Sequence, residues 1–248
     1  MTWLRLVRSE IRKLTTTKMP LAFVGVILVL AGVTAAAVVW GTDMDGSKAF
    51  IATAADQQSL MAFAGNALMG AALFGAVAVA REFGHATVVP TFLTSPRRTL
   101  TMSAQVTAVM VGGALLSIVG ALTVLGAITL GLQFTDYSFL VSAGGVVRVV
   151  AASALAGAAG AALGAGIGWL VRNPGGAVTV VVGVLFISPP IVVQLTPDAA
   201  SWVPSALAWS ISGVTADPSV PMALVAVALW ALVPVLLGLV SIHKRDIV

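Results

Sequence analysis

The sequence predicts an all-α, polytopic membrane protein. We expect six transmembrane helices, an N-terminal amphipathic helix at the membrane interface, and both termini in the cytoplasm. Of the 248 residues, 59% are hydrophobic and only 9% are charged, whereas a soluble domain carries about 25% charged residues. Six uncharged stretches are long enough to cross a bilayer, and basic residues gather in alternate connections. This composition excludes a soluble globular domain, a disordered chain and a nucleic-acid-binding domain.

Residues 1–19 are predicted to form an amphipathic helix in the cytoplasmic headgroup layer. Its apolar residues recur at helical spacing on one face: Trp3, Leu4, Val7, Ile11 and Leu14. The basic residues lie largely off that face: Arg5, Arg8, Arg12 and Lys13. Cations in this position face anionic lipid. The helix is then either a topology anchor or a lever that contacts a partner protein.

The transmembrane domain is predicted to cover residues 20–242. A helix needs about 20 residues to cross a hydrocarbon core of about 30 Å. The uncharged stretches give spans at about 20–41, 59–80, 103–130, 148–171, 174–195 and 221–242. Strands are disfavoured because no stretch alternates between apolar and polar residues, as a membrane barrel requires. A cleaved signal peptide at the first span is disfavoured because the apolar run exceeds the usual length of about 7–15 residues.

The charged residues predict the orientation. With the N-terminus in the cytoplasm, all but two of the 13 basic residues lie inside, and the exceptions are Lys48 and Arg148. The acidic residues on the outside are Asp43, Asp45, Asp56, Asp136, Asp198 and Asp217. This excess of cytoplasmic cations is the positive-inside pattern. Arg148 either reaches the outer headgroups or attracts an anionic lipid or substrate.

Small and polar residues within the spans indicate helix packing. Gly160, Gly164 and Gly168 recur every four residues, which is typical of closely packed membrane helices. No lysine followed by serine or threonine succeeds this glycine run, so it is not a phosphate-binding loop. The default role of the polar residues in or near the spans is hydrogen bonding between helices: Asn66, Gln105, Asn173 and Gln194.

Two connections carry further information. Residues 81–98 form the one sizeable internal cytoplasmic loop, which begins with Arg81 and Glu82 and ends in a Ser-Pro turn before Arg97 and Arg98. Its middle is too apolar for water and too short to span, so it is expected to dock in a protein groove or on the membrane. Residues 196–220 are expected to form an external re-entrant or interfacial segment, because tryptophan favours the headgroup boundary.

The chain resembles the permease subunits of type-2 ATP-binding-cassette (ABC) exporters. The residues that carry the resemblance are Glu10, Lys13 and Leu14 before the first span and Glu82, His85 and Thr87 in the loop, which runs on to Leu93-Thr94-Ser95-Pro96-Arg97-Arg98. The family pattern often has Arg-His-Gly-Thr where this chain has Gly84-His85-Ala86-Thr87, and a lysine where Gln105 stands. These departures bear on the exact docking contacts.

The resemblance implies that residues 81–98 form a coupling loop for a separate ATPase. The implied coupling residues are Glu82, Phe83, His85, Thr87, Phe92, Pro96, Arg97 and Arg98. The implied residues of the interfacial helix are Trp3, Arg5, Arg8, Glu10 and Lys13. The expected partners are two copies of a cytoplasmic ABC ATPase, a second permease copy or paralogue, and membrane lipids. ATP and Mg would bind the ATPase, and this chain would hold no cofactor.

We therefore expect the permease subunit of an exporter in the cell membrane of a bacterium. The apolar spans favour an amphiphilic drug, an antibiotic peptide or a lipid as substrate. The chain is not expected to be an enzyme, since it lacks an ATPase motif, a catalytic triad motif and a metal-binding motif. The alternatives are an intramembrane enzyme that acts on lipids and a non-transporting membrane sensor that signals through the same loop.

Overall fold

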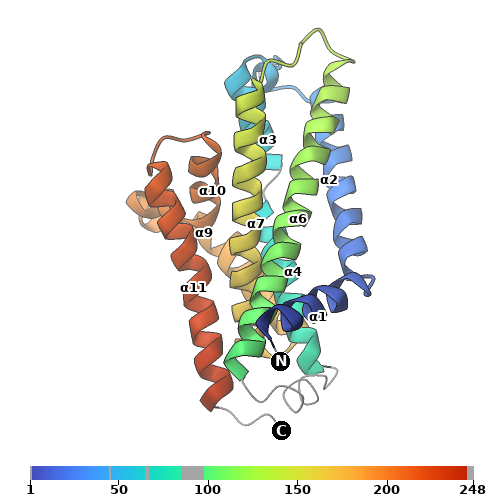
Figure 1. The fold of residues 1–248 in the computed structure, drawn as a ribbon. Helices are drawn as coiled ribbons and strands as arrows, with labels where there is room; N and C mark the ends of the chain where they lie inside the picture. The colour runs from blue at the N-terminus through green and yellow to red at the C-terminus, as the bar shows by residue number, and fades with distance from the viewer. Residues whose placement is uncertain (1, 45, 65–66, 85–97, 245–248) are drawn as a thin grey trace.

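The computed structural model describes residues 2–44, 46–64, 67–84 and 98–244, and every regular element within these residues is a helix. Among them, six helical segments are long and apolar enough to cross a membrane: Met19–Trp40, Ala54–Gly84, Thr99–Leu132, Ala143–Val171, Pro174–Leu195 and Val220–Ile242. This confirms the predicted all-α fold with six transmembrane helices. The long helices form an upright bundle, and the N-terminal helix crosses one of its ends (Figure 1).

The described residues form the following helices. In chain order they are α1 (Trp3–Thr15), α2 (Met19–Trp40), α3 (Ala54–Ala64), α4 (Ala67–Gly84), α6 (Arg98–Leu132), α7 (Ala143–Val171), α8 (Pro174–Val182), α9 (Ser188–Leu195), α10 (Pro204–Ser212) and α11 (Val220–Lys244). Short helical turns lie at Ala49–Ile51 (η1), Gly183–Ile187 (η2) and Pro197–Trp202 (η3). Most membrane helices are longer than their predicted spans, because the helical backbone continues past the uncharged stretch into polar residues.

Helix α7 is the centre of the bundle and packs closely on α4. A Cβ added at Gly164 would lie 1.9 Å from the carbonyl oxygen of Ala72, and one at Gly160 would lie 2.2 Å from that of Leu68. A Cβ at Gly168 would lie 3.0 Å from the carbonyl oxygen of Ala76. The two backbones can therefore touch only because these residues lack a side chain.

Helix α11 packs on another side of α7. A Cβ at Gly166 would lie 2.3 Å from the backbone carbon of Pro234, a proline inside α11. A Cβ added at Gly238 of α11 would lie 2.9 Å from a ring carbon of Trp169, which is buried. Small residues on both helices thus bring α11 against α7 near the α1 end of the bundle.

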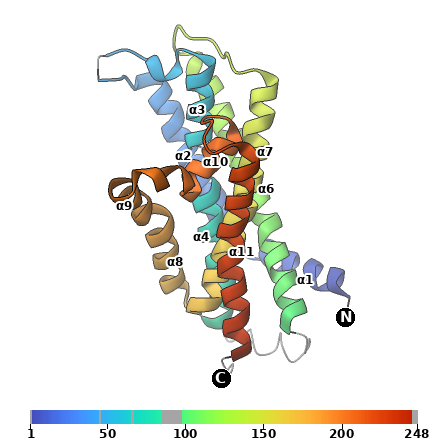
Figure 2. The same ribbon diagram turned by 90° about the vertical axis from the view of Figure 1, so that its left-hand side faces the viewer.

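The fifth membrane segment bends in its middle. Helix α8 runs into the π-helical turn η2, which is followed at once by Ser188, Pro189 and Pro190. A proline has no N–H for the helical hydrogen bond, and its ring displaces the preceding turn, so the helix widens and bends here. Figure 2 shows α9 turning away well short of the height that α2, α6 and α7 reach. The sequence analysis treated 174–195 as one continuous span and missed this bend.

Residues 196–220 contain η3 and α10, which packs against α7 and α11. Leu207 and Ile211 of α10 form a buried cluster with Ala152, Ala223 and Val227. Helix α10 therefore lies against the bundle and below the tips of the long helices (Figure 2).

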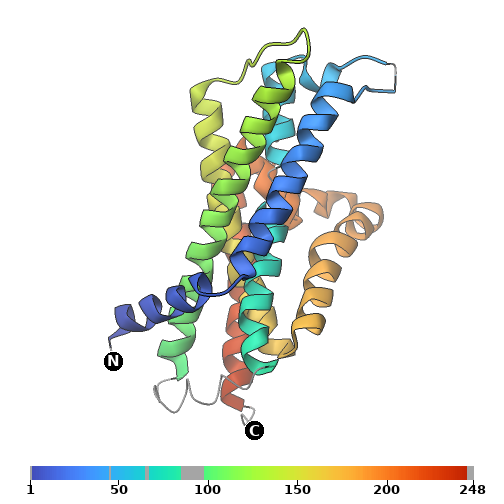
Figure 3. The same cartoon turned by 90° about the vertical axis from the view of Figure 1, so that its right-hand side faces the viewer.

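Helix α1 lies across α6 at the end of the bundle where α11 ends (Figure 3). The residues it buries against the bundle are Leu6 and Glu10, while Leu4 is 72% exposed. The apolar face predicted from the sequence therefore coincides only in part with the face that packs: Leu14 contacts the core cluster around Phe74, whereas Leu4 and Ile11 remain exposed.

The packing of α4 on α7 gives a direct prediction. Gly164→Ala is expected to destabilise the fold by about 1–3 kcal/mol, since the new methyl group overlaps a carbonyl oxygen. Gly32→Ala on α2 is the matched control, because an added Cβ there meets nothing within 4 Å. The control should be neutral or stabilise by up to about 1 kcal/mol through helix propensity. Thermal unfolding in detergent measures both, and equal midpoints would contradict the packing.

Candidate functional site

A charged network at the α1 end of the bundle joins α1 to α4. The Lys13 ammonium lies 2.6 Å from Glu10 Oε1 and 3.4 Å from Glu82 Oε1. The side chain of Glu10 is 8% exposed and that of Glu82 is 16% exposed, while that of Lys13 is 41% exposed. One cation therefore pairs with two largely buried carboxylates, one on each helix.

The local sequence explains how the three groups meet. Glu10 and Lys13 are three residues apart on α1, so they lie on the same side of the helix. Glu82 lies in the last turn of α4, where α1 crosses the bundle. A carboxylate such as Glu10 can face the interior only with a cation beside it, because an unpaired buried charge is costly.

The network extends through α6 to α7. The Gln105 side chain of α6 lies beside the Glu82 carboxylate. Its Oε1 accepts a hydrogen bond of 3.0 Å from Trp169 Nε1 of α7. An amide can donate and accept at once, so Gln105 links an acidic group to an indole. Glu82 is thereby tied to α1, α6 and α7.

The charge of Lys13 is stabilised by this environment. Burial disfavours the charged ammonium, but the nearby carboxylates of Glu82 and Glu10 outweigh that effect and raise the pKa of Lys13 above its ordinary value. Lys13 therefore stays protonated throughout the physiological pH range.

A second contact at the same end joins α4, α7 and α11. The guanidinium of Arg172 lies 5.5 Å from the ring centre of Phe83, the residue after Glu82. Its Nη2 also donates to the carbonyl oxygen of Ser241 in α11 at 3.4 Å. Arg172 is the residue after α7 and has a left-handed backbone with φ of 57°. A cation over an aromatic ring is an attractive contact.

The structure brings together only part of the predicted site. Glu10, Lys13, Glu82 and Phe83 meet at the α1 end, and Trp3 Nε1 donates to Ser103 Oγ at 3.2 Å. Arg5 and Arg8 are exposed on α1. The predicted coupling residues outside the described residues are His85, Thr87, Phe92, Pro96 and Arg97. Arg98 begins α6.

Sequence analysis missed Trp169 and Arg172 as members of the site. Trp169 stands in a span rich in alanine and glycine, and a large indole there is a signal that its N–H needs a partner. Arg172 was counted only as a cytoplasmic cation. Its contacts depend on how α7 and α11 meet, which no local pattern reveals.

Polar side chains also fix the opposite end of the bundle. Gln57 is fully buried, and its Nε2 donates to the carbonyl oxygens of Ile51 and Ser138 at 3.0 and 2.9 Å. Arg148 Nε donates to the carbonyl oxygen of Ile211 at 3.3 Å, at the C-terminal end of α10. A cation is favourable there because of the helix dipole. Arg148 thus holds α10 against α7.

The network at the α1 end joins neighbouring helices through polar contacts. Its groups are two carboxylates, an ammonium, an amide and an indole, and each faces another member of the network. It joins the helix before residues 85–97, the helix after them, and the helix that lies across the bundle. A displacement of that connection would therefore reach α1, α6 and α7 together.

No protein-family model matches the sequence, and no curated protein matches it significantly.

The network predicts a specific response to loss of its cation. Lys13→Gln leaves two carboxylates close together without a counter-charge, and we expect it to lower the free energy of unfolding by about 1–2 kcal/mol. Arg8→Gln is the matched control on the same helix, because Arg8 is exposed, and its effect should stay below about 0.5 kcal/mol. Chemical unfolding in detergent micelles measures both.

A double substitution separates the ion pairs from local effects on α1. Lys13→Gln combined with Glu82→Gln removes one of the stranded charges, so stability should partly recover relative to Lys13→Gln alone. If the double variant loses as much free energy of unfolding as Lys13→Gln and Glu82→Gln lose together, Lys13 and Glu82 do not interact.

Proposed function

We propose that this chain is the permease subunit of a type-2 ABC exporter in a bacterial cell membrane. Two copies, or one copy and a paralogue, form the substrate pathway. Two cytoplasmic ATPase subunits attach at residues 81–98, and ATP and Mg bind to those subunits. The substrate is an amphiphilic drug, an antibiotic peptide or a lipid. The chain itself makes and breaks no covalent bond.

The observation that carries this proposal is the contact between Lys13 of α1 and Glu82 of α4. Glu82 stands just before residues 85–97, which carry most of the resemblance to the exporter family. A motor bound at that connection needs a stiff attachment to the bundle, and the network supplies one through α1, α6 and α7. In this proposal α1 acts as a lever along the membrane.

The distribution of charge supports the orientation. The basic residues at the α1 end include Arg5, Arg8, Arg12, Lys18, Arg81 and Arg172. The opposite end carries Asp43, Asp56 and Asp136. With the α1 end in the cytoplasm, this arrangement obeys the positive-inside rule.

The exposed helix faces support a partner and a lipid boundary. Several leucine, valine and isoleucine side chains on α2, α9 and α11 are about half exposed or more, among them Val29, Ile191 and Leu236. Such faces lie against lipid or against a second copy of the bundle. When ATP draws the two ATPases together, the attached loops would approach and the two bundles would tilt between inward- and outward-facing states.

Charge reversal in the loop tests the proposal. The chain is co-expressed with an ABC ATPase from the same genome, extracted in mild detergent and purified by a tag on the chain. We expect a complex of two chains and two ATPases with ATPase activity. Arg97→Glu with Arg98→Glu should reduce ATPase recovery at least tenfold, since cations would be replaced by anions at the interface.

The matched control reverses two cations that lie outside the loop, Arg5→Glu with Arg8→Glu. This pair should leave ATPase recovery within about twofold of wild type, because rim and remote charges change affinity little. Equal losses in the two double variants would place the ATPase interface elsewhere. A folded chain that recovers no ATPase at all would instead favour the sensor or lipid-enzyme alternatives.

A further inference from the structure

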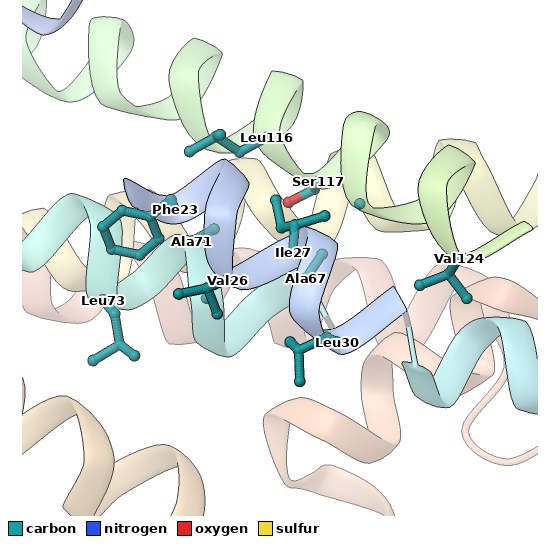
Figure 4. A pocket seen from close by; sticks show the side chains of 12 residues that line it. Phe23, Val26, Ile27, Leu30, Ala67, Ala71, Leu73, Leu116, Ser117 and Val124 are labelled. Atoms are coloured by element: carbon teal, nitrogen blue, oxygen red, sulfur yellow. The ribbon is translucent and has the colours of Figure 1, made fainter. Parts of the chain in front are cut away.

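An apolar cavity of about 330 Å³ lies between α2, α4 and α6. Figure 4 shows Phe23, Ile27 and Leu30 of α2 beside side chains of the other two helices. Among the residues that line the cavity, Ser117 is the one with a polar side chain. A cavity of this chemistry does not hold ordered water, because water needs two or more polar partners.

The cavity results from small residues opposite large ones. Helix α4 contributes Ala67, Gly70 and Ala71 where α2 contributes aliphatic and aromatic side chains. A Cβ added at Gly70 would meet nothing within 4 Å. The sequence of α4 therefore leaves space here, while the same helix uses its glycine and alanine residues for contact with α7.

Both ends of α2 are fixed to the bundle, so α2 does not collapse into this space. Near the α1 end, the rings of Phe23 and Phe74 meet edge to face with centres 5.6 Å apart. Towards the other end, Val38 is fully buried in a cluster with Ile51 and Ile128. The space between these two attachments is a stable feature of the fold.

The cavity opens between α2 and α4 on the outside of the bundle. Val26 is 57% exposed and Leu30 is 52% exposed, and Gly70 is exposed on the facing helix. This mouth faces the membrane interior. A flexible apolar chain can enter it from the bilayer and gain close contacts that the empty cavity lacks.

Two cations lie towards the α1 end of the same cleft. Arg81 is eight residues after Leu73 on α4, which corresponds to about 12 Å along a helix, and its Nη1 lies 4.0 Å from Met19 Sδ of α2. Lys18 precedes α2 and is exposed. Arginine and lysine at the membrane surface attract phosphate groups. The cleft thus combines an apolar chain site with cations at the headgroup level.

We propose that the cavity holds one acyl chain of an anionic membrane phospholipid, with its phosphate at Arg81 and Lys18. The acyl chain separates α2 from α4 along the middle of both helices. The lipid is an integral part of the subunit and a determinant of where α2 stands. This proposal is independent of the export function, since it concerns a site within one copy of the chain.

Lipid retention tests the proposal. The full chain is reconstituted in nanodiscs with equal amounts of phosphatidylglycerol and phosphatidylcholine of the same chain length, then extracted in mild detergent and analysed by native mass spectrometry. The wild type should retain phosphatidylglycerol in clear excess over phosphatidylcholine. Equal retention, or detergent in place of phospholipid, overturns the proposal.

Two variants test the acyl-chain cavity and the headgroup cations separately. Gly70→Leu fills the cavity and should lower the retained phosphatidylglycerol at least tenfold. Gly25→Leu on α2 is the matched control, because a Cβ there also meets nothing within 4 Å and Gly25 does not line the cavity. Arg81→Gln should bring the ratio of the two lipids close to one. Wild-type retention in Gly70→Leu overturns the cavity as the site.

A variant-free measurement keeps the test decisive if Gly70→Leu does not fold. Phosphatidylglycerol with a photoactivatable group on its acyl chain is added to the wild-type chain, and the adducts are mapped by peptide mass spectrometry. Adducts within 23–30 and 67–73 support the proposal. Adducts confined to other segments overturn it.

Discussion

The close approach of the α4 and α7 backbones is the constraint on which the rest of the structure depends. Water does not drive helices together inside a bilayer, so packing and hydrogen bonds must hold the bundle. Glycine at 160, 164 and 168 lets α7 touch the carbonyl groups of α4, and Gly166 lets α11 approach the same helix. Helix α7 then presents Trp169 towards Gln105 of α6. The hydrogen bond from Trp169 fixes the Gln105 side chain, which also lies beside Glu82.

The charged network is a consequence of that packing. Lys13 can join α1 to α4 only because Glu82 is held in place by α6 and α7 behind it. A charged group within reach of three neighbouring helices is costly to bury and sensitive to their relative positions. That sensitivity would suit a contact that transmits motion, as the proposed function requires. It also explains why a carboxylate such as Glu10 lies on the buried side of an otherwise basic helix.

The spans were predictable because charge is excluded from the bilayer, and the prediction of six membrane helices is confirmed. The orientation of α1 on the bundle was not predictable, because its predicted apolar face contains both exposed residues such as Leu4 and packed residues such as Leu14, and the carboxylate Glu10 is buried. The bend at Pro189 and Pro190 was visible in the sequence and was missed. Gln57 and Trp169 could not be assigned, since their partners come from distant parts of the chain.

The proposed function requires α1 and the end of α4 to move together when an ATPase pulls on residues 81–98. The chain contains no cysteine, so Lys13→Cys and Glu82→Cys can be joined selectively by a short, cleavable thiol reagent. ATP-driven export by the reconstituted complex is then measured before and after linking. The account predicts weak export with free thiols and recovery once they are linked. The account would be contradicted if linking the two cysteines abolished the weak export and cleaving the linker restored it.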